Sequence, residues 1–103
     1  MTESDIQNLI RLELAKMGCV SFRANVGSFF TKDGRPIKSG LPNGFPDLFG
    51  YRKSDGKMFF IEVKTDKGIL SKEQKKMQEI LSKDNVIHIV ARCVDDIKVL
   101  EER

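Results

Sequence analysis

The chain has 103 residues, of which 40% are hydrophobic and 32% charged, and its formal net charge is +3. These values predict one small globular domain over residues 1–103 rather than a disordered chain. The single histidine excludes two-histidine metal motifs, and the sequence lacks the GxxxxGK[ST] loop of P-loop nucleotide sites, so no nucleotide cofactor is expected.

The first ten residues, MTESDIQNLI, carry acidic groups where a secretory signal would have basic ones. No apolar run approaches the roughly 20 residues that cross a bilayer. We therefore expect an intracellular protein that does not associate with membranes.

The N-terminal segment is typical of an amphipathic helix. Thr2 or Ser4 is a candidate N-cap, and Gly18 is a natural stop. Apolar residues recur between them at helical spacing: Ile6, Leu9, Ile10, Leu14 and Met17. An alternating segment over residues 19–25 then predicts a strand.

Residues 26–46 are rich in Gly, Pro and polar groups, and Lys32 to Arg35 resemble a hairpin turn between two short arms. The rest of the chain predicts strands over 47–52 and 58–64, a helix over about 71–83, an apolar strand over 86–91, and a short helix from Asp95 or Asp96 toward the C-terminus. This order of elements predicts the α/β class, with a mixed β-sheet flanked by helices.

Two neighbouring predicted strands carry charged residues that could act together. The strand over 47–52 begins with Asp47, and the strand over 58–64 carries Glu62 and Lys64. Alternation places Glu62 and Lys64 on one face of an apolar strand, and a hairpin connection brings Asp47 of the preceding strand toward Glu62. Neighbouring carboxylates repel one another unless a cation lies between them, and Mg²⁺ prefers carboxylate, water and phosphate oxygens. The lysine can orient a metal-bound water, so the set suits hydrolysis of a phosphodiester.

Pro46-Asp47 followed by Glu62-Val63-Lys64 resembles the signature of the PD-(D/E)xK nuclease superfamily. More narrowly, the chain resembles the virus-type replication-repair nuclease (VRR-Nuc) family over residues 3 to about 90. The further marks of this resemblance are Glu3 and Gln7, Arg23-x-Asn25-x-Gly27, Gly44-x-Pro46-Asp47-Leu48 and Ser71-x-x-Gln74.

The resemblance implies a restriction-endonuclease-like core and a Mg²⁺-dependent DNA endonuclease, with Mn²⁺ able to replace Mg²⁺. It implies Asp47, Glu62 and the Val63 carbonyl as metal ligands, with Glu3 reaching the metal directly or through water. Lys64 would activate the attacking water, and Gln74 would orient Lys64 or contact the phosphate. Branched DNA such as a four-way junction is the implied substrate, and small members of this family resemble phage or prophage proteins, which act in the cytoplasm of a bacterial host.

Each of these residues also has a simpler interpretation. Glu62 and Lys64 could form an ion pair on a solvated surface, and Asp47 could be simply a turn residue or the first residue of a strand, without a catalytic role. Gln74 could do no more than complete a capping box with Ser71, and Glu3 could do no more than complement the helix dipole. Other PD-(D/E)xK repair or restriction-type nucleases, and a nucleic-acid-binding module without activity, remain alternatives for the whole chain.

Basic and aromatic side chains around the 26–46 segment predict binding partners. Four basic residues are expected to contact DNA phosphates: Arg23, Lys32, Arg35 and Lys38. A four-way junction has two-fold symmetry and one chain holds one site, so we expect a homodimer. Its candidate interface residues are Phe29, Phe30, Leu41 and Phe45, which could instead form a small core of their own.

Overall fold

A computed structural model describes residues 1–24, 28–38 and 40–101, except the side chains of residues 28, 29 and 38. Asn25 and Gly27, two of the residues that carry the family resemblance, lie outside the described part. None of the described helices is long and apolar enough to cross a membrane.

The elements follow the expected order. Helix α1 (Glu3–Lys16) is followed by strands β1 (Cys19–Arg23), β2 (Ser28–Phe30), β3 (Pro36–Lys38), β4 (Leu48–Arg52) and β5 (Met58–Val63), then by α2 (Lys72–Ser82), β6 (Ile87–Ala91) and the 3₁₀ helix η1 (Val94–Leu100). Four strands form a mixed sheet in the order β1-β4-β5-β6, in which only the β5–β6 pair is parallel. The α/β class with a mixed sheet flanked by helices is confirmed.

Helix α1 begins where the capping pattern predicts. The Thr2 hydroxyl accepts a hydrogen bond from the Asp5 amide, and the Asp5 carboxylate accepts one from the Thr2 amide. This reciprocal pair satisfies amides that the first helical turn leaves without a partner. The core then forms between the apolar side of α1 and one face of the sheet, with fully buried Ile10, Leu14 and Phe59 at its centre.

The last element is the expected short helix, and it is of the 3₁₀ type. Its apolar residues Val94, Ile97 and Leu100 recur every three positions, and the latter two are buried. A 3₁₀ helix has three residues per turn, so this spacing places all three on one side. The element begins at Val94, because the Asp96 carboxylate accepts hydrogen bonds from the amides of Arg92 and Cys93 just before it.

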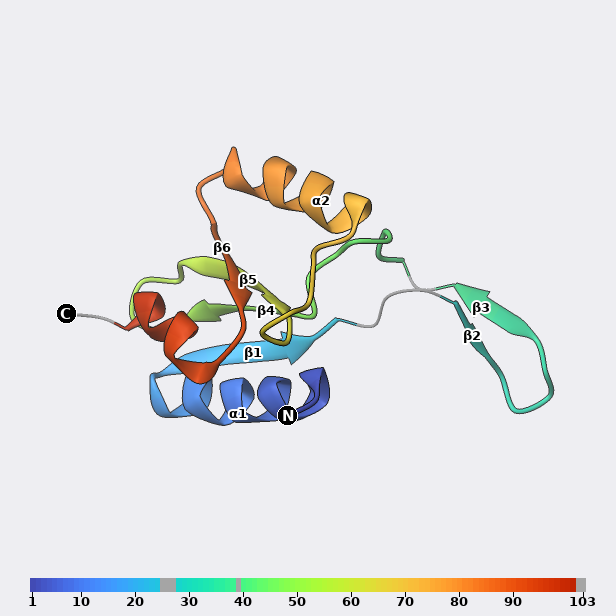
Figure 1. The fold of residues 1–103 in the computed structure, drawn as a ribbon, viewed down its shortest axis with the longest axis horizontal. Helices are drawn as coiled ribbons and strands as arrows, with labels where there is room; N and C mark the ends of the chain where they lie inside the picture. The colour runs from blue at the N-terminus through green and yellow to red at the C-terminus, as the bar shows by residue number, and fades with distance from the viewer. Residues whose placement is uncertain (25–27, 39, 102–103) are drawn as a thin grey trace.

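The two faces of the sheet are covered unequally. Helix α1 packs on one face, while α2 lies over the other near β6 and has no fully buried residue (Figure 1). The face on the α2 side carries an aromatic row in which Phe22 contacts Phe49, and Phe45 contacts both Phe49 and Phe60. Phe22 remains 47% exposed at the β1 end of this row.

Strands β2 and β3 form a separate hairpin that stands away from the main sheet (Figure 1). The turn predicted at Lys32 to Arg35 lies at its tip, where the Thr31 amide donates to the Arg35 carbonyl. Phe30 is 75% exposed and Ile37 50% exposed on this hairpin. We refer to residues 28–38 as the arm.

Candidate active site

Asp47 directly precedes β4 and is held by the strands on both sides of it. Its carbonyl accepts a hydrogen bond from the Ala24 amide at 2.9 Å, just beyond β1. Its carboxylate accepts one from the Val63 amide of β5 at 2.8 Å. The side chain is thereby fixed beside the end of β5. A residue that merely begins a strand would not need this second hydrogen bond through its carboxylate.

Glu62 is buried, with 3% of its surface exposed, and is the one charged residue in that class among residues that the structure describes. The antiparallel register pairs Leu48 with Ile61, so the next position along β5 lies opposite Asp47. The side chain therefore does not belong to a solvated surface ion pair. A buried carboxylate requires hydrogen-bond partners or a cation.

Gln74 of α2 supplies a hydrogen bond to Glu62. Its amide nitrogen donates to a Glu62 carboxylate oxygen. Its amide oxygen accepts from the Ser71 amide at 2.8 Å, and the Ser71 hydroxyl accepts from the Gln74 amide at 3.1 Å. The interpretation of Gln74 as a capping residue is confirmed, and the cap directs its –NH₂ group toward Glu62.

Burial raises the proton affinity of both acids, and nearby negative charges add to this effect. Loss of hydration, followed by the nearby charge of Asp47, raises the pKa of Glu62 to about 7, although the positive charge of Lys64 opposes this. Loss of hydration also raises the pKa of Asp47, against the lowering effect of its hydrogen bond from Val63. Two acids with raised pKa values at one place are typical of functional sites.

Lys64 follows β5, and its amide donates to the Ala91 carbonyl at 3.0 Å. Its ammonium lies 4.0 Å from the carboxylate of Glu3 on the first turn of α1. The Lys64 side chain is only 14% exposed, against 53% for Glu3. Glu3 therefore has a specific neighbour besides the helix N-terminus, and that neighbour is Lys64.

The donor set of the site suits a hard cation. Two carboxylates that repel one another adjoin the backbone of Val63, and oxygen is the ligand that Mg²⁺ prefers. Over the described ranges, no three His, Cys, Asp or Glu side chains converge closely enough to hold a metal ion. The acids that adjoin the Val63 backbone are thus Asp47 and Glu62, while Glu3 contacts Lys64 and its negative charge also raises the pKa of both acids.

Gly44 supports this arrangement in a way that its place in the sequence motif did not indicate. It has a φ of +87°, and a Cβ atom there would lie 2.5 Å from the carbonyl carbon and oxygen of Glu73. The segment before Asp47 and the first turn of α2 can therefore touch only because residue 44 is glycine. This contact keeps Gln74 close to Glu62.

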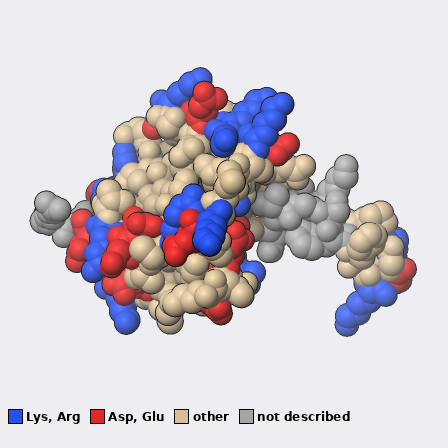
Figure 2. All heavy atoms as spheres, viewed as in Figure 1, with Lys and Arg blue, Asp and Glu red and all other residues tan. Residues whose placement is uncertain are grey.

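The predicted phosphate-binding residues lie in two places, Arg23 opposite Leu48 in the main sheet and the others on the arm. Arg23 is exposed at the end of β1, while Lys32 and Arg35 lie at the tip of the arm, where Arg35 pairs with Asp33 at 2.8 Å. The side chains of Lys38 and Phe29 lie outside the described part. Figure 2 shows a second group of basic side chains over α2, which contributes Lys72, Lys75 and Lys76.

His88 lies in β6 opposite Phe60. Its Nδ1 atom is buried and has no hydrogen-bond partner among the described residues, and burial lowers the pKa of its imidazole. This environment favours a neutral ring.

Comparison with known proteins gives one match. The model of the family described as the VRR-NUC domain matches residues 1–95. No curated protein and no solved structure matches the chain. The matched region contains every side chain of the candidate site.

Proposed function

The chain belongs to the VRR-NUC domain family, a family of nucleases, and on this premise we propose that it is a Mg²⁺-dependent DNA endonuclease. Asp47, Glu62 and the Val63 carbonyl would hold the metal ion, and Mn²⁺ would replace Mg²⁺. The observation that carries the proposal is the buried Glu62 carboxylate beside Asp47, with its pKa raised to about 7.

The metal ion, when bound, supplies the positive charge that stabilises two ionised carboxylates and polarises a phosphodiester. The protein's own side chains do the positioning. Gln74 orients the Glu62 carboxylate, and the Val63 amide orients Asp47. Lys64 presents an ammonium group to the phosphate and the attacking water, while Glu3 restrains that ammonium from α1.

A plasmid-nicking assay with and without Mg²⁺ tests this function. We expect cleavage by the wild-type chain in Mg²⁺ or Mn²⁺, none in EDTA, and binding without turnover in Ca²⁺, which has looser geometry. Asp47→Asn should abolish cleavage while keeping the hydrogen bond from Val63. If the wild-type chain binds DNA but leaves it intact with every metal, the chain is a binding module without activity.

We further propose branched DNA as the substrate and a homodimer as the active form. One site cuts one strand, whereas paired nicks in a four-way junction require two sites related by two-fold symmetry. The arm supports this proposal, since an isolated two-stranded hairpin is marginally stable and this one exposes Phe30 and Ile37. A second copy of the chain would cover these side chains.

The arm would also contact DNA through its basic residues. Each phosphate contact contributes roughly 0.9 to the slope of log K against log salt. Changing Arg35 and Lys38 together should weaken binding and lower that slope by about 1 to 2. The lower value applies if the ion pair between Arg35 and Asp33 persists in the complex. An unchanged slope would show that the arm does not touch the DNA backbone.

A further inference from the structure

The loop of residues 65–70 joins the two parts of the candidate site. Lys64 lies immediately before it, and Ser71, which caps α2 and orients Gln74, lies immediately after it. A shift of this loop would therefore move the lysine and the glutamine relative to Asp47 and Glu62. The loop needs a restraint of its own if the site is to keep its geometry.

The side chains of the loop supply little restraint. Asp66, Lys67 and Ile69 are exposed, and Ile69 is 79% exposed. Within the loop, the Gly68 amide donates to the Thr65 carbonyl at 3.1 Å, which closes a turn. This turn directs the carbonyl groups of Thr65, Asp66 and Gly68 toward the same point.

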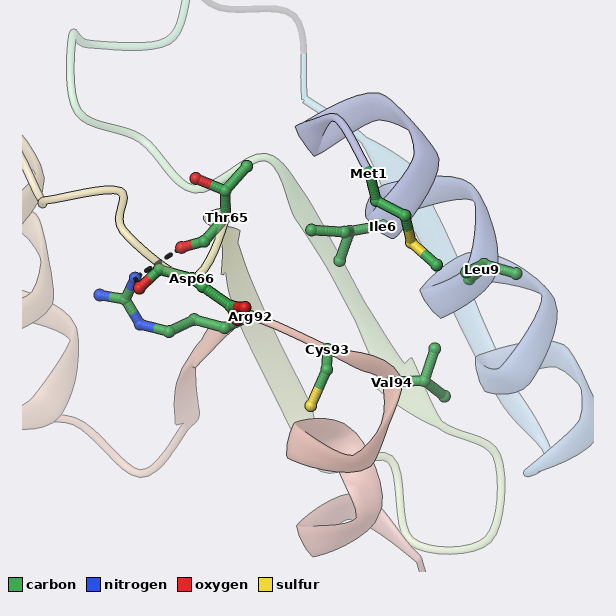
Figure 3. Close-up of a pocket in the computed structure, with 8 residues that line it drawn as sticks. All are labelled: Met1, Ile6, Leu9, Thr65, Asp66, Arg92, Cys93 and Val94. Carbon is green, nitrogen blue, oxygen red and sulfur yellow. Dashed lines mark hydrogen bonds between the residues drawn. The ribbon is translucent and has the colours of Figure 1, made fainter.

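Arg92 binds those carbonyl groups. Its Nη1 atom lies 2.7 Å from the carbonyl oxygen of Thr65, 3.2 Å from that of Asp66 and 2.7 Å from that of Gly68. Hydrogen bonds from a charged donor are stronger than neutral ones, and this donor is partly buried. Figure 3 shows the guanidinium directed at the Thr65 carbonyl, beside a cavity of about 320 Å³ that Thr65, Asp66 and Arg92 help to line.

Arg92 is itself firmly placed. Its amide donates to the Asp96 carboxylate at 2.8 Å, and the preceding residue, Ala91, accepts the Lys64 amide through its carbonyl. The end of β6 therefore holds the chain at Lys64 through the backbone and holds the following loop through the Arg92 side chain. The guanidinium does so without a hydrogen bond or ion pair to the acids of the site, so far as the described residues show.

We propose that Arg92 is a positioning residue of the nuclease site, which fixes the 65–70 loop and thereby sets Lys64 and Gln74 against Asp47 and Glu62. This inference rests on the proposed nuclease function. Misplacement of a catalytic group by about 1 Å reduces rates by up to roughly a hundredfold. Loss of Arg92 should therefore slow the chemical step rather than weaken DNA binding.

The test compares Arg92→Met, which keeps an apolar stem, with Arg92→Lys, which keeps a charged donor. The matched control is Arg52→Met, because Arg52 forms an ion pair with Asp55 beside the β4–β5 turn and, among the described residues, no hydrogen bond or ion pair joins its side chain to the site. Three quantities are measured for each protein: the single-turnover cleavage rate in Mg²⁺, the Kd for DNA in Ca²⁺, and the hydrogen exchange of the Gly68 and Gly56 amides by NMR without metal.

For Arg92→Met we expect a rate at least about tenfold lower, a Kd within about twofold of wild type, and faster exchange at Gly68 but not at Gly56. Arg92→Lys should recover part of the rate. Arg52→Met should leave the rate and the Gly68 exchange unchanged.

Unchanged Gly68 exchange in Arg92→Met would overturn the inference, as would a wild-type rate in that variant. If the wild-type chain itself cleaves no DNA, the proposed function and this role of Arg92 both fail, while faster exchange at Gly68 would still show that Arg92 restrains the loop. If Arg92→Met does not fold, Arg92→Lys serves as the test instead. A full loss of cleavage in Arg92→Lys while Gly68 exchanges as in wild type would contradict the proposal that Arg92 acts through the loop.

Discussion

Replacing Glu62 with glutamine should stabilise the metal-free protein at alkaline pH while abolishing cleavage. Glutamine has the same shape, and its side-chain oxygen can still accept the hydrogen bond from Gln74. The change removes only a buried negative charge that burial and Asp47 destabilise. A residue of the site therefore weakens the fold that carries it.

The size of the effect follows from the pKa of Glu62, which rises from 4.5 to about 7. One pKa unit corresponds to about 1.4 kcal/mol, so the ionised form is destabilised by at most roughly 3 kcal/mol. Screening by nearby solvent reduces this to about 1–2 kcal/mol. The folded protein binds a proton more tightly than the unfolded chain, so the free energy of unfolding falls as the pH rises from about 4.5 to about 7.

Urea unfolding in EDTA at about pH 5 and about pH 8 measures this difference. We expect Glu62→Gln to exceed wild type by about 1–2 kcal/mol at the higher pH and by much less at the lower pH, where Glu62 is largely protonated. Glu101→Gln, on an exposed residue, is the control and should change stability little at either pH. Equal differences at both pH values, or a less stable Glu62→Gln protein at the higher pH, would refute the reasoning.

Three further changes test other parts of the structure. In thermal melts, Gly44→Ala should lower stability by about 2–3 kcal/mol, because its Cβ would collide with Glu73, and it should also reduce cleavage. Gly56→Ala is the control: its φ is +71° and the space around it is open, so it should lower stability by only about 1 kcal/mol. Lys64→Ala should lose turnover but change the Kd for DNA in Ca²⁺ by less than about threefold, and a large loss of binding would contradict its role in the chemical step. Phe30→Asp should convert a dimer into a monomer in light scattering, since Phe30 is 75% exposed on the arm; a variant that remains dimeric would exclude the arm as the interface.

Periodicity along the sequence was enough to predict most of the fold. The capping pattern at Thr2 and the apolar spacing of α1 depend on residues within a few positions of one another, and so do the alternation of β5 and the turn of the arm. The short last helix was also predicted, whereas its 3₁₀ type, which fits the three-residue spacing of Val94, Ile97 and Leu100, was not specified. The meeting of Asp47 and Glu62 followed from a hairpin, which is also a local connection.

The state of the site was decided by contacts between distant parts of the chain. From the sequence, Glu62 could be a surface residue and Gln74 only a cap. In the folded protein Glu62 is buried, and the packing of α2 on the sheet brings Gln74, 12 positions away, into hydrogen-bond contact with it. The bonds from Val63 to Asp47 and from Arg92 to Thr65 span 16 and 27 positions. Local sequence determines which residues share a strand or a helix face, whereas burial, and with it the raised pKa of Glu62, exists only once separate segments exclude water from the same place.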